Sequence, residues 1–193
     1  NLEFDGDGTG DGASAKAKYV ARMDNGDPTG TSNLFIDNCV AHDFNDKFIK
    51  PYGNNGMDSL VVTNSVFYNG ASEGIVLYSG SSSDPAAVIN HSIIENCTFY
   101  DIEREAIKGQ THPDNVVRIS NVTVVRCGNV ENKALMYFRD MTDVVVKNSI
   151  FAHSTNADAG EEFVDMASDA SLFHNNAWWD IVNSEVGNGT VSD

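Results

Sequence analysis

Val145-Val146-Lys147-Asn148-Ser149-Ile150-Phe151 begins with an alternating apolar run that ends at Asn148. The aromatic residue Phe151 follows three positions after this asparagine. Similar runs, most of them followed by a large apolar residue, end at asparagines spaced by 26, 32, 25, 27 and 27 residues: Asn38, Asn64, Asn96, Asn121, Asn148 and Asn175. A near-constant period of this length is typical of repeat proteins, in which each repeat buries its apolar face against the next one. The alternation within each run indicates β-strands.

Strands that recur once per repeat predict an all-β chain, folded as a right-handed, single-stranded parallel β-helix of about six coils. Neighbouring rungs of a parallel sheet lie about 4.8 Å apart, so equivalent residues of successive coils stack directly. Two such columns are apolar and are expected to line the interior. They are the column two positions before each asparagine, Ile36, Val62, Ile94, Ile119, Val146 and Phe173, and the column three positions after it, Ala41, Phe67, Phe99, Val124, Phe151 and Trp178.

The asparagines themselves are expected to mark the bend between two strands of each coil. Asparagine tolerates the left-handed backbone conformation that such a bend needs, and its amide can bond to the amides above and below. A third strand is expected later in most coils, with buried residues at Phe48, Ile75, Ile107, Leu135 and Phe163. Cys39 and Cys97 are expected to stay unbridged, because two rungs separate their Cα atoms by about 9.6 Å.

Length and composition limit the possible functions. The 193 residues suit one domain, residues 1–193, with a sizeable core. Asn1 begins within a strand pattern, so we expect the domain to belong to a longer chain with additional domains. The net charge of −16 argues against a nucleic-acid partner, because an acidic surface repels phosphates. No apolar run is long enough for a membrane span.

One segment near the N-terminus resembles the first half of an EF-hand calcium loop. Asp5, Asp7 and Asp11 stand among glycines at ligand positions of such a loop. Lys16, however, occupies the position where the loop needs a bidentate glutamate. Two alternatives remain: the three aspartates bind calcium, or the segment is an acidic connection without an ion.

Basic and aromatic residues gather around the expected third strand. Lys108 follows Ile107 on the outward side of this strand, and Arg139 ends the equivalent strand one coil later. A polysaccharide lyase must neutralise a uronate carboxylate and remove the neighbouring proton, and lysine and arginine can supply both functions. Lys108 and Arg139 are therefore the candidate catalytic residues, and the candidate substrate-binding residues are His112, Tyr137, Glu105 and Tyr78. The alternative is that they are ordinary solvated residues at strand ends.

The strings Leu34 to Cys39 (LFIDNC), Ile94 to Tyr100 (IENCTFY) and Val145 to Phe151 (VVKNSIF) resemble the pectate-lyase-like superfamily of right-handed parallel β-helices. More narrowly, they are similar to β-helix domains of surface lipoproteins in Bacteroidetes glycan-utilisation systems. The resemblance covers most of the chain. It implies a protein that is extracellular or lies on the outer-membrane surface and whose partner is a polysaccharide. Two alternatives remain for this polysaccharide: it is anionic, or it is neutral. Alginate- and chondroitin-type lyases of the superfamily use a lysine and an arginine on adjacent coils, and Lys108 and Arg139 would fill these places.

Three functions remain open at this level. The first is a non-catalytic domain that binds polysaccharide at the cell surface. The second is a polysaccharide lyase that acts by β-elimination on uronates, and the third is a structural spacer or adhesin segment. The lack of a recognisable catalytic motif and the acidic charge favour the first function. A basic pocket around Lys108 and Arg139 would favour the second, and a uniformly acidic exterior the third.

Overall fold

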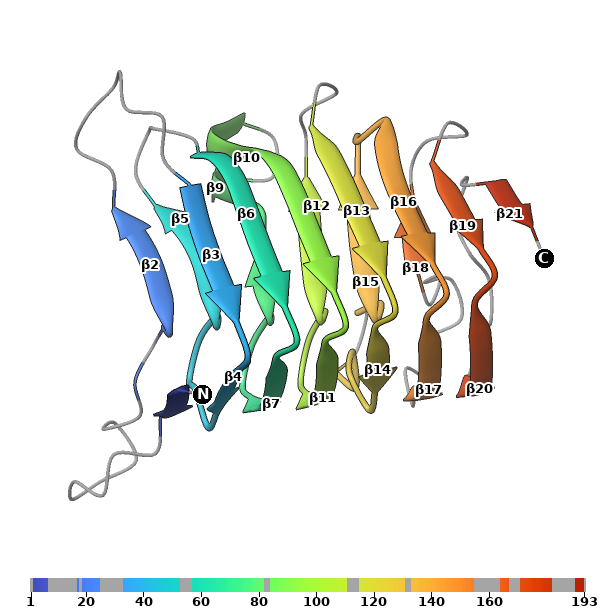
Figure 1. Cartoon of the computed structure of the whole chain (residues 1–193), viewed down its shortest axis with the longest axis horizontal. Helices are drawn as coiled ribbons and strands as arrows, with labels where there is room; N and C mark the ends of the chain where they lie inside the picture. Colours follow the sequence, from blue (N-terminus) through green and yellow to red (C-terminus); the bar gives the residue numbers. More distant parts are fainter. Residues whose placement is uncertain are drawn as a thin grey trace.

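The computed structural model describes residues 2–6, 17, 19–24, 33–52, 57–81, 84–110, 115–130, 133–154, 164–166, 171–181 and 190–192. Every regular element in these ranges is a β-strand, and none of these segments forms a helix that is long and apolar enough to cross a membrane. The strands follow one another in the same order in each coil and build three sheets along the molecule (Figure 1).

We name the sheets by the order in which a coil visits them. The first sheet is eight-stranded and contains β3 (Asn33–Asp37), β6 (Met57–Thr63), β10 (Asp84–Glu95), β13 (Val116–Ser120), β16 (Asp143–Lys147), β19 (Leu172–His174) and β21 (Thr190–Ser192), with β9 (Tyr78–Ser81) paired to β10. The second sheet is seven-stranded and contains β1 (Leu2–Asp5), β4 (Cys39–His42), β7 (Val66–Gly70), β11 (Thr98–Ile102), β14 (Thr123–Val125), β17 (Ile150–Ser154) and β20 (Ala177–Ile181). The third sheet is six-stranded and contains β2 (Ala21–Asp24), β5 (Ile49–Tyr52), β8 (Ile75–Val76), β12 (Ile107–Gln110), β15 (Met136–Arg139) and β18 (Val164–Met166).

The register confirms the predicted parallel β-helix. Equivalent residues of successive coils pair in parallel, so that Ile94 of β10 lies between Val62 of β6 and Ile119 of β13. The antiparallel pair formed by β9 and the start of β10 is a hairpin inserted into one coil. This insertion explains why Asn64 and Asn96 are separated by 32 residues, the longest spacing in the chain.

Both predicted apolar columns line the core. Their central members are all at most 1% exposed: Val62, Ile94, Ile119, Val146, Phe67, Phe99, Val124 and Phe151. The rings of Phe67 and Phe99 stack with their centres 5.1 Å apart. Trp178 lies on β20, the last second-sheet strand among the described residues, and is 41% exposed. The three cysteines are all free, as predicted.

The asparagine column forms the bend between the first and second sheets, as predicted. All six asparagines have a left-handed φ between 50° and 54°. From Asn38 to Asn148, the backbone N–H of each donates to the carbonyl of the residue before the next asparagine, for example from Asn96 to Ser120 at 3.2 Å. One step of the expected asparagine ladder is confirmed, because the side chain of Asn96 donates to Asn64 at 3.3 Å. Asn64 itself donates to Asp37 at 2.8 Å instead of to an asparagine.

A second column of left-handed residues, which the repeat pattern did not reveal, forms the next bend. Five residues after each asparagine stand Asp43, Asn69, Asp101, Arg126, His153 and Asp180, with φ between 51° and 61°. Arginine and histidine are uncommon in this conformation, and here each pairs with an aspartate of the same column. Arg126 lies 2.5 Å from Asp101, and His153 lies 2.8 Å from Asp180. The constant distance between the two bends sets the length of the second-sheet strands.

The third sheet departs from the prediction by one residue in two coils. The structure aligns Ile49, Ile75, Ile107, Met136 and Val164 in one fully buried column. Phe48 and Leu135, which were predicted at this level, directly precede the column, and Phe163 lies outside the described residues. Phe48 and Leu135 are also fully buried, because the chain bends into each strand and both successive side chains pack on the core.

Candidate functional site

The outward face of the third sheet carries a column of mostly basic and aromatic side chains. Each buried residue that begins a strand is followed by one on the opposite face, since successive side chains of a strand alternate. On five successive strands these outward positions hold Arg22, Lys50, Val76, Lys108 and Tyr137, which we call the outer column. Neighbours along the outer column are one rung, about 4.8 Å, apart.

Basic residues are concentrated on this side of the molecule. Seven of the ten described lysines and arginines lie on third-sheet strands or within the three residues before them: Arg22, Lys47, Lys50, Arg104, Lys108, Lys133 and Arg139. The same described segments contain five acidic residues: Asp24, Asp46, Glu73, Glu105 and Asp165. This side therefore has a small excess of basic residues in a chain whose net charge is −16.

Lys108 is the most enclosed cation of the outer column. Its Nζ lies 3.2 Å from Oε1 of Glu105 and 3.5 Å from Oε1 of Glu73, and it sits 5.3 Å from the centre of the Tyr137 ring. Desolvation alone would lower the pKa of Lys108, but the charges of Glu105, Tyr78 and Glu73 outweigh it and raise the pKa. Lys108 is therefore a protonated cation held between two carboxylates and an aromatic ring.

Glu73 joins Lys108 to the preceding coil. Its Oε2 accepts a hydrogen bond from Ser72 at 2.5 Å and lies 3.3 Å from Nζ of Lys47, while Arg104 approaches its Oε1 at 3.6 Å. Burial opposes ionisation of Glu73, but the Ser72 hydroxyl and the two lysines dominate and lower its pKa to about 2. The buried carboxylate is thus fully ionised near neutral pH and holds cations from the two coils that neighbour its own.

Lys50 differs from Lys108 because its charge is not balanced locally. No carboxylate lies within ion-pair distance of Lys50 among the described residues. Desolvation and the charge of Lys47 lower the pKa of Lys50. The sequence analysis did not name Lys50 as a site residue, although it directly follows a buried residue of its strand, as Lys108 does.

Two buried acceptors flank Lys108. Oε2 of Glu105 and Oε1 of Gln110 are both buried and accept no hydrogen bond within the described structure. Glu105 and Gln110 are each 2% exposed, so an unpaired oxygen on either side chain is energetically unfavourable.

The remaining predicted site residues are brought together only in part. Arg139 is the register partner of Gln110, two residues along the strands from the pair Lys108 and Tyr137. Its Nε lies 3.5 Å from Oδ2 of Asp140, and both side chains are exposed. Tyr78 is 9% exposed, and burial raises the pKa of its hydroxyl. Its ring is thus mostly covered and offers little surface to a ligand. His112 lies outside the described residues.

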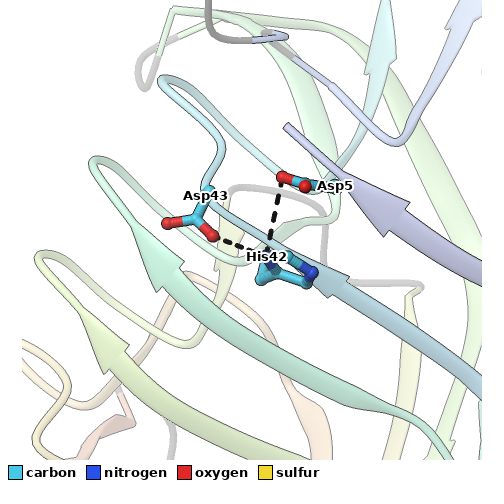
Figure 2. A group of neighbouring side chains, drawn as sticks. All are labelled: Asp5, His42 and Asp43. Atoms are coloured by element: carbon cyan, nitrogen blue, oxygen red, sulfur yellow. Dashed lines mark hydrogen bonds and ion pairs between the residues drawn. The ribbon is translucent and has the colours of Figure 1, made fainter. Parts of the chain in front are cut away.

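The predicted calcium ligands are only partly described, since Asp7 and Asp11 lie outside the described residues. Asp5 ends β1 and faces the imidazole of His42 and the carboxylate of Asp43 (Figure 2). These three residues form a cluster with metal-ligand chemistry in the described part of the chain. The imidazole of His42 is a partner that the sequence analysis missed.

Comparison of the chain with protein-family models, with curated proteins and with solved structures finds no significant match. The third-sheet site must therefore be judged by its own chemistry. It offers cations for anionic groups and the Tyr137 ring for the apolar face of a sugar.

Proposed function

We propose that the protein is a non-catalytic polysaccharide-binding domain of a cell surface and that the outer column of the third sheet is its binding face. The observation that carries the proposal is the alignment of Arg22, Lys50, Lys108 and Tyr137 on four of five successive strands, in a chain of net charge −16. Val76 occupies the remaining position, between Lys50 and Lys108. A linear polymer that follows the axis of the β-helix would meet basic or aromatic side chains at most steps of this column.

An anionic polysaccharide fits this face best. The charge of Lys108 is already balanced by Glu73 and Glu105, whereas Lys50 has no such partner among the described residues. A uronate or sulfate group beside Lys50 would form charge-assisted hydrogen bonds with it.

The electrostatics of Lys108 favour binding over β-elimination. A general base must be unprotonated to take a proton and is most effective when its pKa lies near the working pH. The pKa of Lys108 is raised, so this residue holds its own proton instead. Lys50, whose pKa is lowered, is the residue that a lyase would use on this face, and this observation keeps the lyase as the second candidate.

Titration calorimetry against polygalacturonate, alginate, chondroitin sulfate and a neutral glucan tests the proposal. Lys50→Ala is the decisive variant, because it removes a cation without leaving a paired carboxylate behind. We expect the wild type to bind an anionic polymer and Lys50→Ala to weaken that binding about tenfold, the effect of one charge-assisted hydrogen bond. Lys147→Ala removes an exposed lysine from the first sheet and should leave the affinity unchanged.

Three other outcomes would contradict the proposal. Failure to bind any of the polymers would favour a spacer or adhesin segment. Equal weakening by Lys50→Ala and Lys147→Ala would indicate general charge attraction without a site on the third sheet. Release of an unsaturated, ultraviolet-absorbing product that disappears in Lys50→Ala would identify a lyase.

A further inference from the structure

A separate cluster of charged side chains lies at the end of the second-sheet strands β1 and β4. Asp5 and His42 are register partners on these neighbouring strands. Asp43 follows His42 at the second bend, where its backbone is left-handed with a φ of 61°. Figure 2 shows the carboxylates of Asp5 and Asp43 directed at the same edge of the His42 ring, and one ligand atom from each residue lies within 4.8 Å of the others.

We infer that Asp5, His42 and Asp43 bind one divalent transition-metal ion such as Zn²⁺. Nδ1 of His42 lies 2.5 Å from Oδ2 of Asp43 and 3.8 Å from Oδ1 of Asp5. On the other side of the ring, Nε2 lies 3.1 Å from Oε1 of Glu3. When Nε2 donates its hydrogen to Glu3, Nδ1 directs its lone pair at two carboxylate oxygens. Either a proton on Nδ1 that is donated to Asp43 or a metal ion beside these atoms then relieves the repulsion.

A metal ion can contact more of these ligand atoms than a proton can. A proton on Nδ1 can be shared with Asp43, but Oδ1 of Asp5 is too far from Nδ1 for a hydrogen bond. A divalent ion can contact all three ligand atoms, and its charge balances the two aspartates. Glu3 then holds the far nitrogen of the imidazole, as carboxylates do for many metal-binding histidines.

The imidazole is also held by ring stacking. The ring of Tyr68, from the next coil, stacks on His42 at 4.7 Å with an interplanar angle of 10°, and Tyr100 stacks on Tyr68 in the same way. His42 is 8% exposed, whereas the Asp5 side chain is 57% exposed. The nitrogen ligand is therefore rigid and covered, and the Asp5 side is open for the ion and for water ligands.

The set of donor atoms favours a transition ion over calcium. Calcium takes about six to eight oxygen ligands, whereas an imidazole nitrogen with carboxylate oxygens suits Zn²⁺ and its neighbours in the first transition row. Asp5, which the sequence analysis grouped with Asp7 and Asp11 as a calcium ligand, has His42 and Asp43 as its neighbours among the described residues.

The other end of the molecule provides an internal comparison. His153 and Asp180 occupy the same second-bend column as Asp43, and Nδ1 of His153 lies 2.8 Å from Oδ2 of Asp180. Within the described residues this pair is not joined by a further ligand group, unlike His42. A histidine with one carboxylate is a weak metal site, so this pair serves as the control.

Titration of the metal-free protein with Zn²⁺ tests the inference, with calorimetry for affinity and thermal unfolding for stability. We expect one Zn²⁺ per chain and a higher unfolding temperature in its presence. Asp5→Asn and Asp43→Asn should each weaken Zn²⁺ binding at least about tenfold. Asparagine tolerates the left-handed backbone at position 43, so both variants should fold. Asp180→Asn should leave the Zn²⁺ affinity unchanged.

Two results would overturn the inference. One is the absence of saturable Zn²⁺ binding, or binding that is as tight in Asp5→Asn and Asp43→Asn as in the wild type. The other is tighter binding of Ca²⁺ than of Zn²⁺ to the wild-type chain, which would exclude a transition-ion site.

Discussion

Nζ of Lys108 lies 3.5 Å from Oε1 of Glu73, although the two residues are 35 positions apart in the sequence. They meet because Lys108 belongs to β12 and Glu73 precedes β8, the adjacent strand of the third sheet. The exposed fractions of the two side chains are only 13% and 7%, so solvent screens the pair weakly. Neighbouring coils are thus joined by a charge contact in addition to backbone hydrogen bonds.

Removal of the Lys108 ammonium group should destabilise the fold. In Lys108→Ala the carboxylates of Glu73 and Glu105 stay buried with one cation fewer, and we expect the free energy of unfolding to fall by about 3 kcal/mol. Urea unfolding followed by circular dichroism measures this change. Lys147→Ala, at an exposed position, should change it by less than about 0.5 kcal/mol. A loss below about 1 kcal/mol in Lys108→Ala would mean that the ion pair is dispensable.

Acid should weaken the fold through Glu73. Its pKa falls from the ordinary value of 4.5 to about 2 on folding, so its contribution is fully present above pH 4.5 and is lost as the pH falls toward 2. The lost contribution is of the order of 3 kcal/mol. We expect the stability difference between wild type and Glu73→Gln, measured by urea unfolding, to shrink from about pH 5 to about pH 2. A difference that does not change with pH would contradict the lowered pKa.

Truncation of the central aromatic stack should leave a cavity. Phe99 is fully buried and stacks on Phe67, so Phe99→Ala should lower the free energy of unfolding by about 3–5 kcal/mol. Phe35 is 70% exposed on the first sheet, and Phe35→Ala is the matched control with an expected loss below about 1 kcal/mol. Similar losses in the two variants would show that the column around Phe99 is not a close-packed interior.

The first bend should tolerate glycine better than alanine. Asn121 has an exposed side chain and a φ of 54°, so the backbone conformation is the main requirement at this position. Asn121→Ala should lower the free energy of unfolding by about 1–2 kcal/mol because of the left-handed backbone. Asn121→Gly should lower it less, since glycine adopts this conformation readily. Thermal unfolding compares the two variants, and the reverse order would argue against backbone strain as the cause.

The coil repeat, the inner columns and the first bend were predictable because each depends on a pattern within one coil. Alternation and an asparagine such as Asn121 recur in six coils, so a weak local signal is repeated until it is unambiguous. Stacking of Phe67 on Phe99 then follows from the spacing of rungs. The second bend was also present at a constant distance from each asparagine, but Arg126 and His153 concealed it because these residue types seldom adopt left-handed backbone.

The third sheet shows where a single-chain pattern stops being informative. Ile49, Ile75 and Ile107 follow their asparagines by 11 residues, but Met136 and Val164 follow theirs by 15 and 16. Connections of different length after the second bend shift the alignment between coils. Sequence reasoning therefore placed Lys108 and Tyr137 near each other without showing that the ammonium group lies over the ring.

The charge partners depend on tertiary structure alone. Glu73 holds cations from the coils on both sides of its own, and His42 meets Asp5 from a strand 37 residues earlier. The backbone path follows from apolar periodicity, which any one coil displays. The pKa of a carboxylate or the donor set of a metal site depends on atoms a few ångströms apart, and those atoms come together only when separate coils are stacked in register.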